Sequence, residues 1–105
     1  MSVSHVTGKN FDEFVSGNGV TVVDFGAPWC APCKAMKPVM DDFAKKHAGK
    51  VRVAMVDVEE ECALAGRMHI SSLPHIAVYK NGELVETLVG ALPPAKLAEK
   101  ISLFF

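Results

Sequence analysis

The sequence predicts an α/β fold in which a mixed sheet of five strands is flanked by four helices. Three observations support this prediction. Short segments rich in β-branched and apolar residues alternate with segments whose apolar residues recur at helical spacing. Residues 20–25 are mostly apolar on both faces, which is typical of a central strand covered on both sides. Asn81-Gly82, between two apolar runs, indicates a β-hairpin.

The first quarter of the chain contains two expected strands and one helix. Val3–Val6 is a short strand candidate. A helix is expected to begin at Asn10, because its side chain can cap the helix and Glu13 follows three residues later. Gly17 should end this helix. The buried strand at residues 20–25 comes next.

The longest helix is expected over roughly residues 32–47. Pro38 lies inside it and should kink it, because proline removes a backbone donor. Apolar residues at helical spacing predict one buried face. The residues of this stripe are Met36, Met40, Phe43 and His47. A strand at residues 51–57 follows, with Val51, Val53 and Met55 on one face.

The second half of the chain should contain two helices around the hairpin. We expect a short helix at residues 59–68, strands at 76–80 and 84–89, and a final helix opened by Pro93-Pro94. Because helical crossovers connect the early strands, those strands should be parallel, whereas the hairpin strands must be antiparallel. The residues expected on the buried side of the final helix are Leu97, Ile101 and Phe104.

Length, composition and charge limit the class of protein. A chain of 105 residues fits one domain, residues 1–105, and can bury a core without disulfide staples. Half of the residues are hydrophobic and 22% are charged, as in globular proteins. A net charge of −1 gives no electrostatic reason to expect a nucleic-acid or membrane partner. The sequence shows no signal-peptide or membrane-spanning pattern, and three cysteines make a poor disulfide framework, so we expect a cytoplasmic location.

The pair Cys30 and Cys33 is the strongest candidate for chemistry. It lies between the expected central strand and the longest helix. The start of a helix favours a thiolate, and the thiolate is the form that attacks a disulfide. Pro32 suits the first turn of the helix, which brings Cys33 close to Cys30. We therefore expect Cys30 to be the exposed nucleophile and Cys33 the shielded resolving cysteine of a thiol–disulfide oxidoreductase.

A metal site is the plainer alternative for this C-x-x-C pair. A structural zinc ion takes about four ligands. His47 follows Cys33, but no second histidine lies three to five residues farther on. The remaining candidate ligands are scattered along the chain. They are His5, Cys62, His69 and His75. We therefore expect no metal.

Asp24 and Cys62 each leave two interpretations open. Asp24 lies in the apolar strand shortly before Cys30, and a buried carboxylate is costly unless it is paired or protonated. It is either a strand-end acid bonded to the backbone or the proton acceptor for Cys33. Cys62 is either a partly buried thiol in a short helix or a regulatory site of oxidation or modification.

Together, these segments resemble the thioredoxin family over nearly the whole chain. The matching segments are residues 22–25 and 27–34, Pro38, Ser72-Leu73-Pro74, Asn81-Gly82 and Val89-Gly90-Ala91. The resemblance implies a thioredoxin fold and a cytosolic protein disulfide reductase, an electron carrier recharged by an NADPH-dependent thioredoxin reductase. It implies no cofactor on the chain, and we expect a monomer.

The resemblance also assigns roles around the cysteine pair. Pro32 would tune the redox potential, and Asp24 would be the proton acceptor. By frequency alone the Leu73–Pro74 bond would be trans, and the proline would only open the next strand. The resemblance implies instead a cis bond whose backbone edge meets an extended substrate. The residues expected at the substrate-binding surface are Trp29, Leu73, His75 and Gly90.

Four positions depart from the family pattern. Ala31 replaces the usual glycine between the cysteines, and Gly26 stands where a tryptophan is common. Met55 replaces a lysine that often neighbours the buried aspartate, and His75 follows the loop proline where threonine is usual. The changes at Ala31 and His75 bear on the redox potential and the partner surface, not on the thiol chemistry. A redox-independent binding module and an oxidase or isomerase of secreted proteins are the competing functions.

Overall fold

The order of elements agrees with the sequence-based expectation. The structure, a computed structural model, describes residues 3–105, in which five strands and four helices follow the order β-α-β-α-β-α-β-β-α. The strands are β1 (Ser4–His5), β2 (Val20–Gly26), β3 (Val51–Asp57), β4 (His75–Lys80) and β5 (Glu83–Val89). The helices are α1 (Phe11–Val15), α2 (Ala31–Lys46), α3 (Cys62–Arg67) and α4 (Pro94–Ser102).

The sheet is mixed, as predicted. Its strand order is β1-β3-β2-β4-β5, with β1, β3 and β2 parallel and β4 and β5 antiparallel. The hairpin between β4 and β5 turns at Asn81 and Gly82, which have φ of 52° and 87°. Positive φ at both central residues matches the right-handed twist of the two strands, which explains the Asn-Gly pair.

Strand β2 is the centre of the sheet, and all seven of its residues are buried. Two of them are polar, Thr21 and Asp24. Thr21 has a partner, because its Oγ1 accepts a hydrogen bond of 2.6 Å from Arg52 Nη2. Asp24 is therefore the polar side chain of this strand that needs a further explanation.

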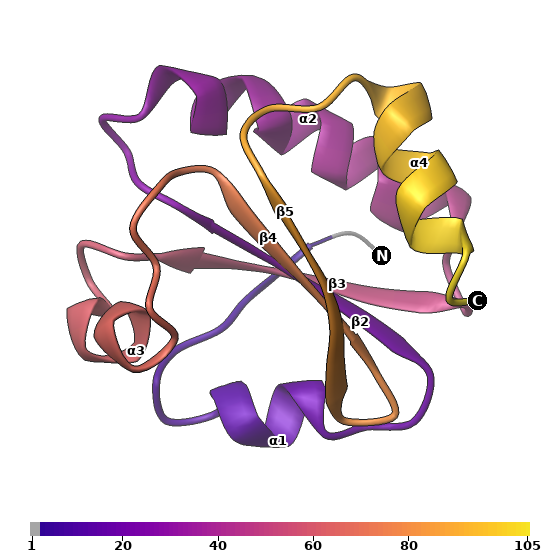
Figure 1. Ribbon diagram of the computed structural model, residues 1–105, viewed down its shortest axis with the longest axis horizontal. Coiled ribbons are helices and arrows are strands. Elements are labelled where there is room, and N and C mark those ends of the chain that lie inside the picture. The colour runs from indigo at the N-terminus through magenta and orange to yellow at the C-terminus, as the bar shows by residue number, and fades with distance from the viewer. Residues whose placement is uncertain (1–2) are drawn as a thin grey trace.

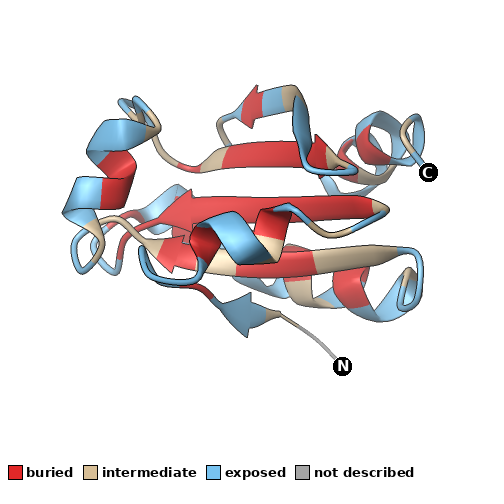
Figure 2. Ribbon diagram, turned by 90° about the horizontal axis from the view of Figure 1, so that it is seen from below, coloured by how far each residue is buried: buried red, intermediate tan, exposed pale blue. Residues whose placement is uncertain are grey.

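Helices cover both faces of the sheet and divide the core into two main clusters. Helices α2 and α4 lie on one face and α1 and α3 on the other (Figure 1). Most of β2 and β4 is buried between these layers, whereas the outer helix surfaces are exposed (Figure 2). The cluster between the sheet and helices α2 and α4 includes Val22, Met36, Met40, Leu97 and Ile101. The cluster on the side of α1 and α3 includes Phe11, Val23, Phe25, Leu64 and Tyr79.

Some local expectations were wrong. Asn10 does not cap α1 through its side chain; its Oδ1 instead accepts a 2.8 Å hydrogen bond from the backbone N–H of Thr7. Helix α3 begins at Cys62 rather than near residue 59, because Asp57 Oδ1 accepts from the backbone N–H of Glu59 and starts a turn there. In both places a side-chain oxygen accepts a hydrogen bond from a nearby backbone N–H, two residues later for Asp57 and three residues earlier for Asn10.

Candidate active site

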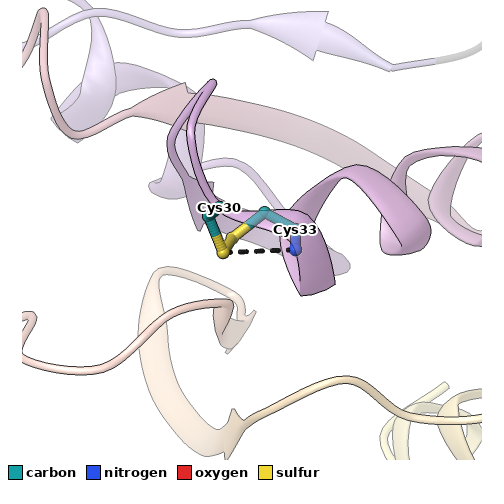
Figure 3. Close-up of a disulfide and its surroundings, with 2 residues drawn as sticks. All are labelled: Cys30 and Cys33. Carbon is teal, nitrogen blue, oxygen red and sulfur yellow. Dashed lines mark hydrogen bonds between the residues drawn. A yellow bond between two sulfur atoms is a disulfide. The ribbon is translucent and has the colours of Figure 1, made fainter.

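The two cysteines lie at the start of α2, just after the chain leaves β2. Cys30 is the N-cap residue of α2 and Cys33 is in its first turn, with Cα atoms 5.2 Å apart and the two sulfurs joined in a disulfide (Figure 3). The backbone N–H of Cys33 donates a 3.2 Å hydrogen bond to Cys30 Sγ. On reduction, a negative charge on Cys30 would meet this donor and the positive end of a 16-residue helix. The geometry thus favours a thiolate at Cys30.

The expected contrast in exposure between the two cysteines is not seen. Cys30 is 7% exposed and Cys33 is 5% exposed, so both residues are buried in this oxidised form. They pack with Ala27 against Val58 and Leu73. What separates the two cysteines is the space that each one faces, because Cys30 lines an open groove and Cys33 lines a smaller cavity.

The groove beside Cys30 has a volume of about 660 Å³. It brings together Trp29, Cys30, Pro32 and Leu73, four of the residues expected at the site. Trp29 is 66% exposed, and its indole Nε1 donates a 2.8 Å hydrogen bond to Glu59 Oε2, which fixes the ring at the groove. Glu59 could not be expected at the site from the sequence, because Trp29 and Glu59 meet only when β3 lies beside β2. The other lining residues are Ala31, Val58, Cys62, Ala65, Gly66, Ile70 and Ser71.

The proline loop forms the opposite edge of this region. The Leu73–Pro74 peptide bond is cis, as the resemblance implied, and the carbonyl of Pro74 accepts a 2.9 Å hydrogen bond from Gly90 N–H. His75 packs edge-on against Phe25, with ring centroids 5.9 Å apart, and burial lowers its pKa. Neither His75 nor Gly90 lines the groove itself. They flank the loop that presents Pro74.

Asp24 is a buried carboxylate without a partner. It is 1% exposed, and neither of its oxygens has a hydrogen-bond partner among residues 3–105. The alternative of an acid bonded to the backbone is therefore wrong. Burial without compensation raises the pKa of Asp24 from 3.8 to about 7.

Asp24 also lies on the same face of β2 as the disulfide. Gly26 is two residues farther along the strand, and a Cβ built there would lie 3.1 Å from Cys33 Cβ. Residues two apart on a strand share a face and are separated by roughly 7 Å. Met55 is the register partner of Asp24 on β3 and provides no charge to offset its burial.

Cys62 is exposed, so the expectation of a partly buried thiol was wrong. It is the first residue of α3 and lines the same groove as Cys30. The structure leaves it as a free cysteine. Its position makes it accessible to whatever enters the groove.

Within residues 3–105, no three or more His, Cys, Asp or Glu side chains are grouped so that they could hold a metal ion. No helix in the same range is both long and apolar enough to cross a membrane.

Comparison with known proteins gives a consistent result. The family model described as Thioredoxin matches residues 2–103. A thioredoxin of Staphylococcus saprophyticus is 40% identical over 101 residues, which are 96% of each chain. An M-type chloroplastic thioredoxin of Spinacia oleracea is 40% identical over 100 residues, which are 94% of this chain and 55% of the relative. The crystal structure of a Malassezia sympodialis thioredoxin superposes with a TM-score of 0.88 and 36% identity, covering 98% of this chain and 90% of that one.

Proposed function

Because the chain belongs to the thioredoxin family and is a thiol–disulfide oxidoreductase, we propose that it is a protein disulfide reductase that carries electrons on the Cys30–Cys33 pair. An NADPH-dependent thioredoxin reductase returns the pair to the dithiol. One observation carries the proposal: a disulfide at the N-terminus of α2, with the backbone N–H of Cys33 directed at Cys30 Sγ beside an open groove. This arrangement favours the thiolate and gives it access to a substrate.

The first step is attack by Cys30. Its thiolate forms a bond to one sulfur of the substrate disulfide and breaks the substrate's S–S bond, releasing one substrate thiolate. A mixed disulfide now joins the substrate to Cys30. Trp29, Pro32 and Leu73 line the groove in which this intermediate sits, and the backbone edge at Pro74, flanked by His75 and Gly90, accepts an extended segment.

The second step needs a base at Cys33. The Cys33 thiol loses its proton, attacks Cys30 Sγ and releases the second substrate thiolate, so that the protein is oxidised and the substrate reduced. Asp24 is the proton acceptor in this proposal. With a pKa of about 7, a substantial fraction of Asp24 is ionised at neutral pH, and it shares a strand face with the glycine that packs on Cys33.

The remaining assignments follow from the same interpretation. The chain acts as a single domain, residues 1–105, and as a monomer with no cofactor of its own. Pro32 tunes the redox potential, and Ala31 and His75 shift that potential and the partner surface relative to the family pattern. Cys62 is assigned in this proposal as a regulatory thiol at the groove. The proposed location is cytoplasmic, although the spinach relative is chloroplastic.

An insulin-reduction assay with NADPH and a thioredoxin reductase tests the proposal. The parent protein should reduce insulin catalytically, and Cys30→Ser should not. Cys33→Ser should accumulate a mixed disulfide with insulin through Cys30, detectable by mass spectrometry. A parent protein that is inactive with the reductase, but active with dithiothreitol, would reject the proposed electron donor. Insulin trapped by Cys30→Ser instead of Cys33→Ser would reverse the roles of the two cysteines.

A further inference from the structure

The lining of the groove beside Cys30 contains no Asp, Glu, Lys, Arg or His residue. It consists of aromatic, aliphatic and small side chains, two cysteines and one serine. Such a lining can hold an extended segment of a substrate, but it does not distinguish a positively charged segment from a negatively charged one. A preference for one charge must therefore come from ionised groups at the edge of the groove.

Glu59 places a carboxylate at one edge of this groove. Its Oε2 accepts the 2.8 Å hydrogen bond from Trp29 Nε1, and Trp29 directly precedes Cys30 in the chain. The backbone N–H of Glu59 donates a 2.8 Å hydrogen bond to Asp57 Oδ1, so the backbone is held as well as the side chain. Glu59 is exposed and forms no salt bridge within residues 3–105. Its negative charge is therefore held next to the reacting cysteine and remains open to solvent.

Glu60 adds a second carboxylate in the same turn between β3 and α3. It is exposed, and it too forms no salt bridge in the described part of the chain, residues 3–105. Glu61, the third glutamate of the run, is held elsewhere, because its Oε1 accepts a 2.8 Å hydrogen bond from the backbone N–H of Gly8. Glu59 and Glu60 therefore form the acidic rim of the groove.

The basic side chains nearby are engaged elsewhere or lie on another side. Arg67 follows a lining residue, but its Nη1 and Nη2 donate to Asp12 at 3.2 and 2.9 Å. Lys34 and Lys37 line the smaller cavity, which shares no lining residue with the groove. His69 precedes another lining residue and is exposed. Above the ordinary histidine pKa of about 6.5, the charge that a substrate meets at the groove is therefore negative.

We propose that the acidic rim makes the groove prefer disulfides in positively charged segments, in which a lysine or arginine lies next to the reacting cysteine. Opposite charges at the edge of a binding surface raise the rate of productive encounter and disfavour partners of like charge. Because both carboxylates are exposed, the preference should be severalfold and should fall as salt is added. The inference rests on the proposed function, since it concerns the same groove and adds the class of substrate.

Two peptide disulfides of opposite charge measure the preference. They are the symmetric disulfides of acetyl-Gly-Leu-Cys-Lys-Gly-amide and of acetyl-Gly-Leu-Cys-Glu-Gly-amide. Reduced protein is mixed with each disulfide at about pH 8 and low ionic strength, and the released peptide thiol is quantified by chromatography after an acid quench. All proteins carry Cys62→Ser, so that the Cys30–Cys33 pair provides the only thiols.

Each rate constant is divided by that of the same peptide disulfide with 2-mercaptoethanol. The thiolate of this reagent carries the same single charge as the thiolate of Cys30, so the division removes both the intrinsic reactivity of the peptide and its attraction to a thiolate. The normalised rate should be about threefold or more higher for the lysine peptide than for the glutamate peptide. Added salt should bring this ratio toward one.

Two double variants with the same change in net charge test the acidic rim. Glu59→Gln with Glu60→Gln should lose most of the preference, while the glutamine at position 59 can still accept the hydrogen bond from Trp29. Glu83→Gln with Glu99→Gln should keep the preference. Glu83 lies at the hairpin end of β5, and Glu99 lies on α4, which covers the face of the sheet opposite α3 (Figure 1).

Equal normalised rates for the two peptides, or a higher rate for the glutamate peptide, would overturn the proposal. A ratio that both double variants change alike would also overturn it, because the effect would then come from the net charge of the protein and not from the acidic rim. These results are distinct from failure of the proposed function. A protein that reduces both peptides equally is still a disulfide reductase, whereas a protein that reduces neither peptide would reject the proposed function and this inference together.

Discussion

Replacing Asp24 by asparagine should change how the stability of the protein depends on pH. In the folded protein the pKa of Asp24 is raised from 3.8 to about 7 by burial. The native state thus holds this proton more tightly than the unfolded chain does. Below pH 3.8 the carboxyl is protonated in both states and the stability that it contributes is fully present. That stability falls as the pH rises toward 7, and the loss is constant at higher pH.

The size of this loss follows from the two pKa values. One pKa unit corresponds to about 1.36 kcal/mol, so the difference between 3.8 and about 7 gives a loss of about 4 kcal/mol. Asparagine does not titrate in this range. Its amide has its own cost of burial, roughly 1–3 kcal/mol, but that cost does not change with pH. The free energy of unfolding of Asp24→Asn minus that of the parent should therefore increase by about 4 kcal/mol between pH 4 and pH 9.

Urea unfolding of the two oxidised proteins at half-unit pH steps measures this difference. The burial cost of the asparagine amide is the same at every pH. Only the titration of Asp24 therefore changes the difference in free energy of unfolding between the two proteins as the pH rises. The variant should also turn over more slowly in the insulin assay, since the proposed proton acceptor is gone. A stability difference that stays flat from pH 4 to pH 9, or an Asp24→Asn protein less stable than the parent at pH 8, would mean that the native carboxylate is ionised and well compensated. Burial would then not raise the pKa of Asp24.

Three other substitutions have definite expected results. Met55→Lys should lower the pKa of Asp24, because a cation at its register partner on β3 stabilises the carboxylate. In urea unfolding, the loss of stability between pH 4 and pH 9 should then be smaller than in the parent, and an unchanged pH profile would contradict this. Cys62→Ser should retain at least about half of the insulin-reducing activity, because serine is nearly isosteric and Cys62 has no disulfide partner; a tenfold loss in a folded variant would contradict this. Leu97→Ala should lower the free energy of unfolding, measured in urea, by about 2–5 kcal/mol, because Leu97 is fully buried between α4 and the sheet. A change below about 1 kcal/mol would contradict this and show that the surrounding side chains fill the space that alanine leaves.

The general fold was predictable from local patterns. The alternation of strand and helix segments, the apolar character of residues 20–25 and the Asn81-Gly82 turn each act over a few residues, so the sequence alone determined them. The mixed sheet is confirmed because the crossover and hairpin rules depend only on the order of the elements. The start of α3 was less predictable, since Asp57 Oδ1 accepts a backbone hydrogen bond that competes with helix formation there. Helix α1 begins directly after Asn10 as expected, but without the expected side-chain cap.

The sequence by itself also determined the pair of cysteines and their place at the start of a helix. Only the tertiary structure decided which space each cysteine faces, because that depends on segments distant in sequence. Glu59 holds Trp29 at the groove beside Cys30, and residues of β3 line the cavity beside Cys33. Likewise, Asp24 could have been bonded or unbonded on sequence alone. Its isolation and its raised pKa result from the packing of β3, β4 and α2 around β2, which removes water without supplying a hydrogen-bond donor. The lack of a partner for a buried acid and the shape of a cavity are properties of the whole packed chain, and no local pattern encodes them.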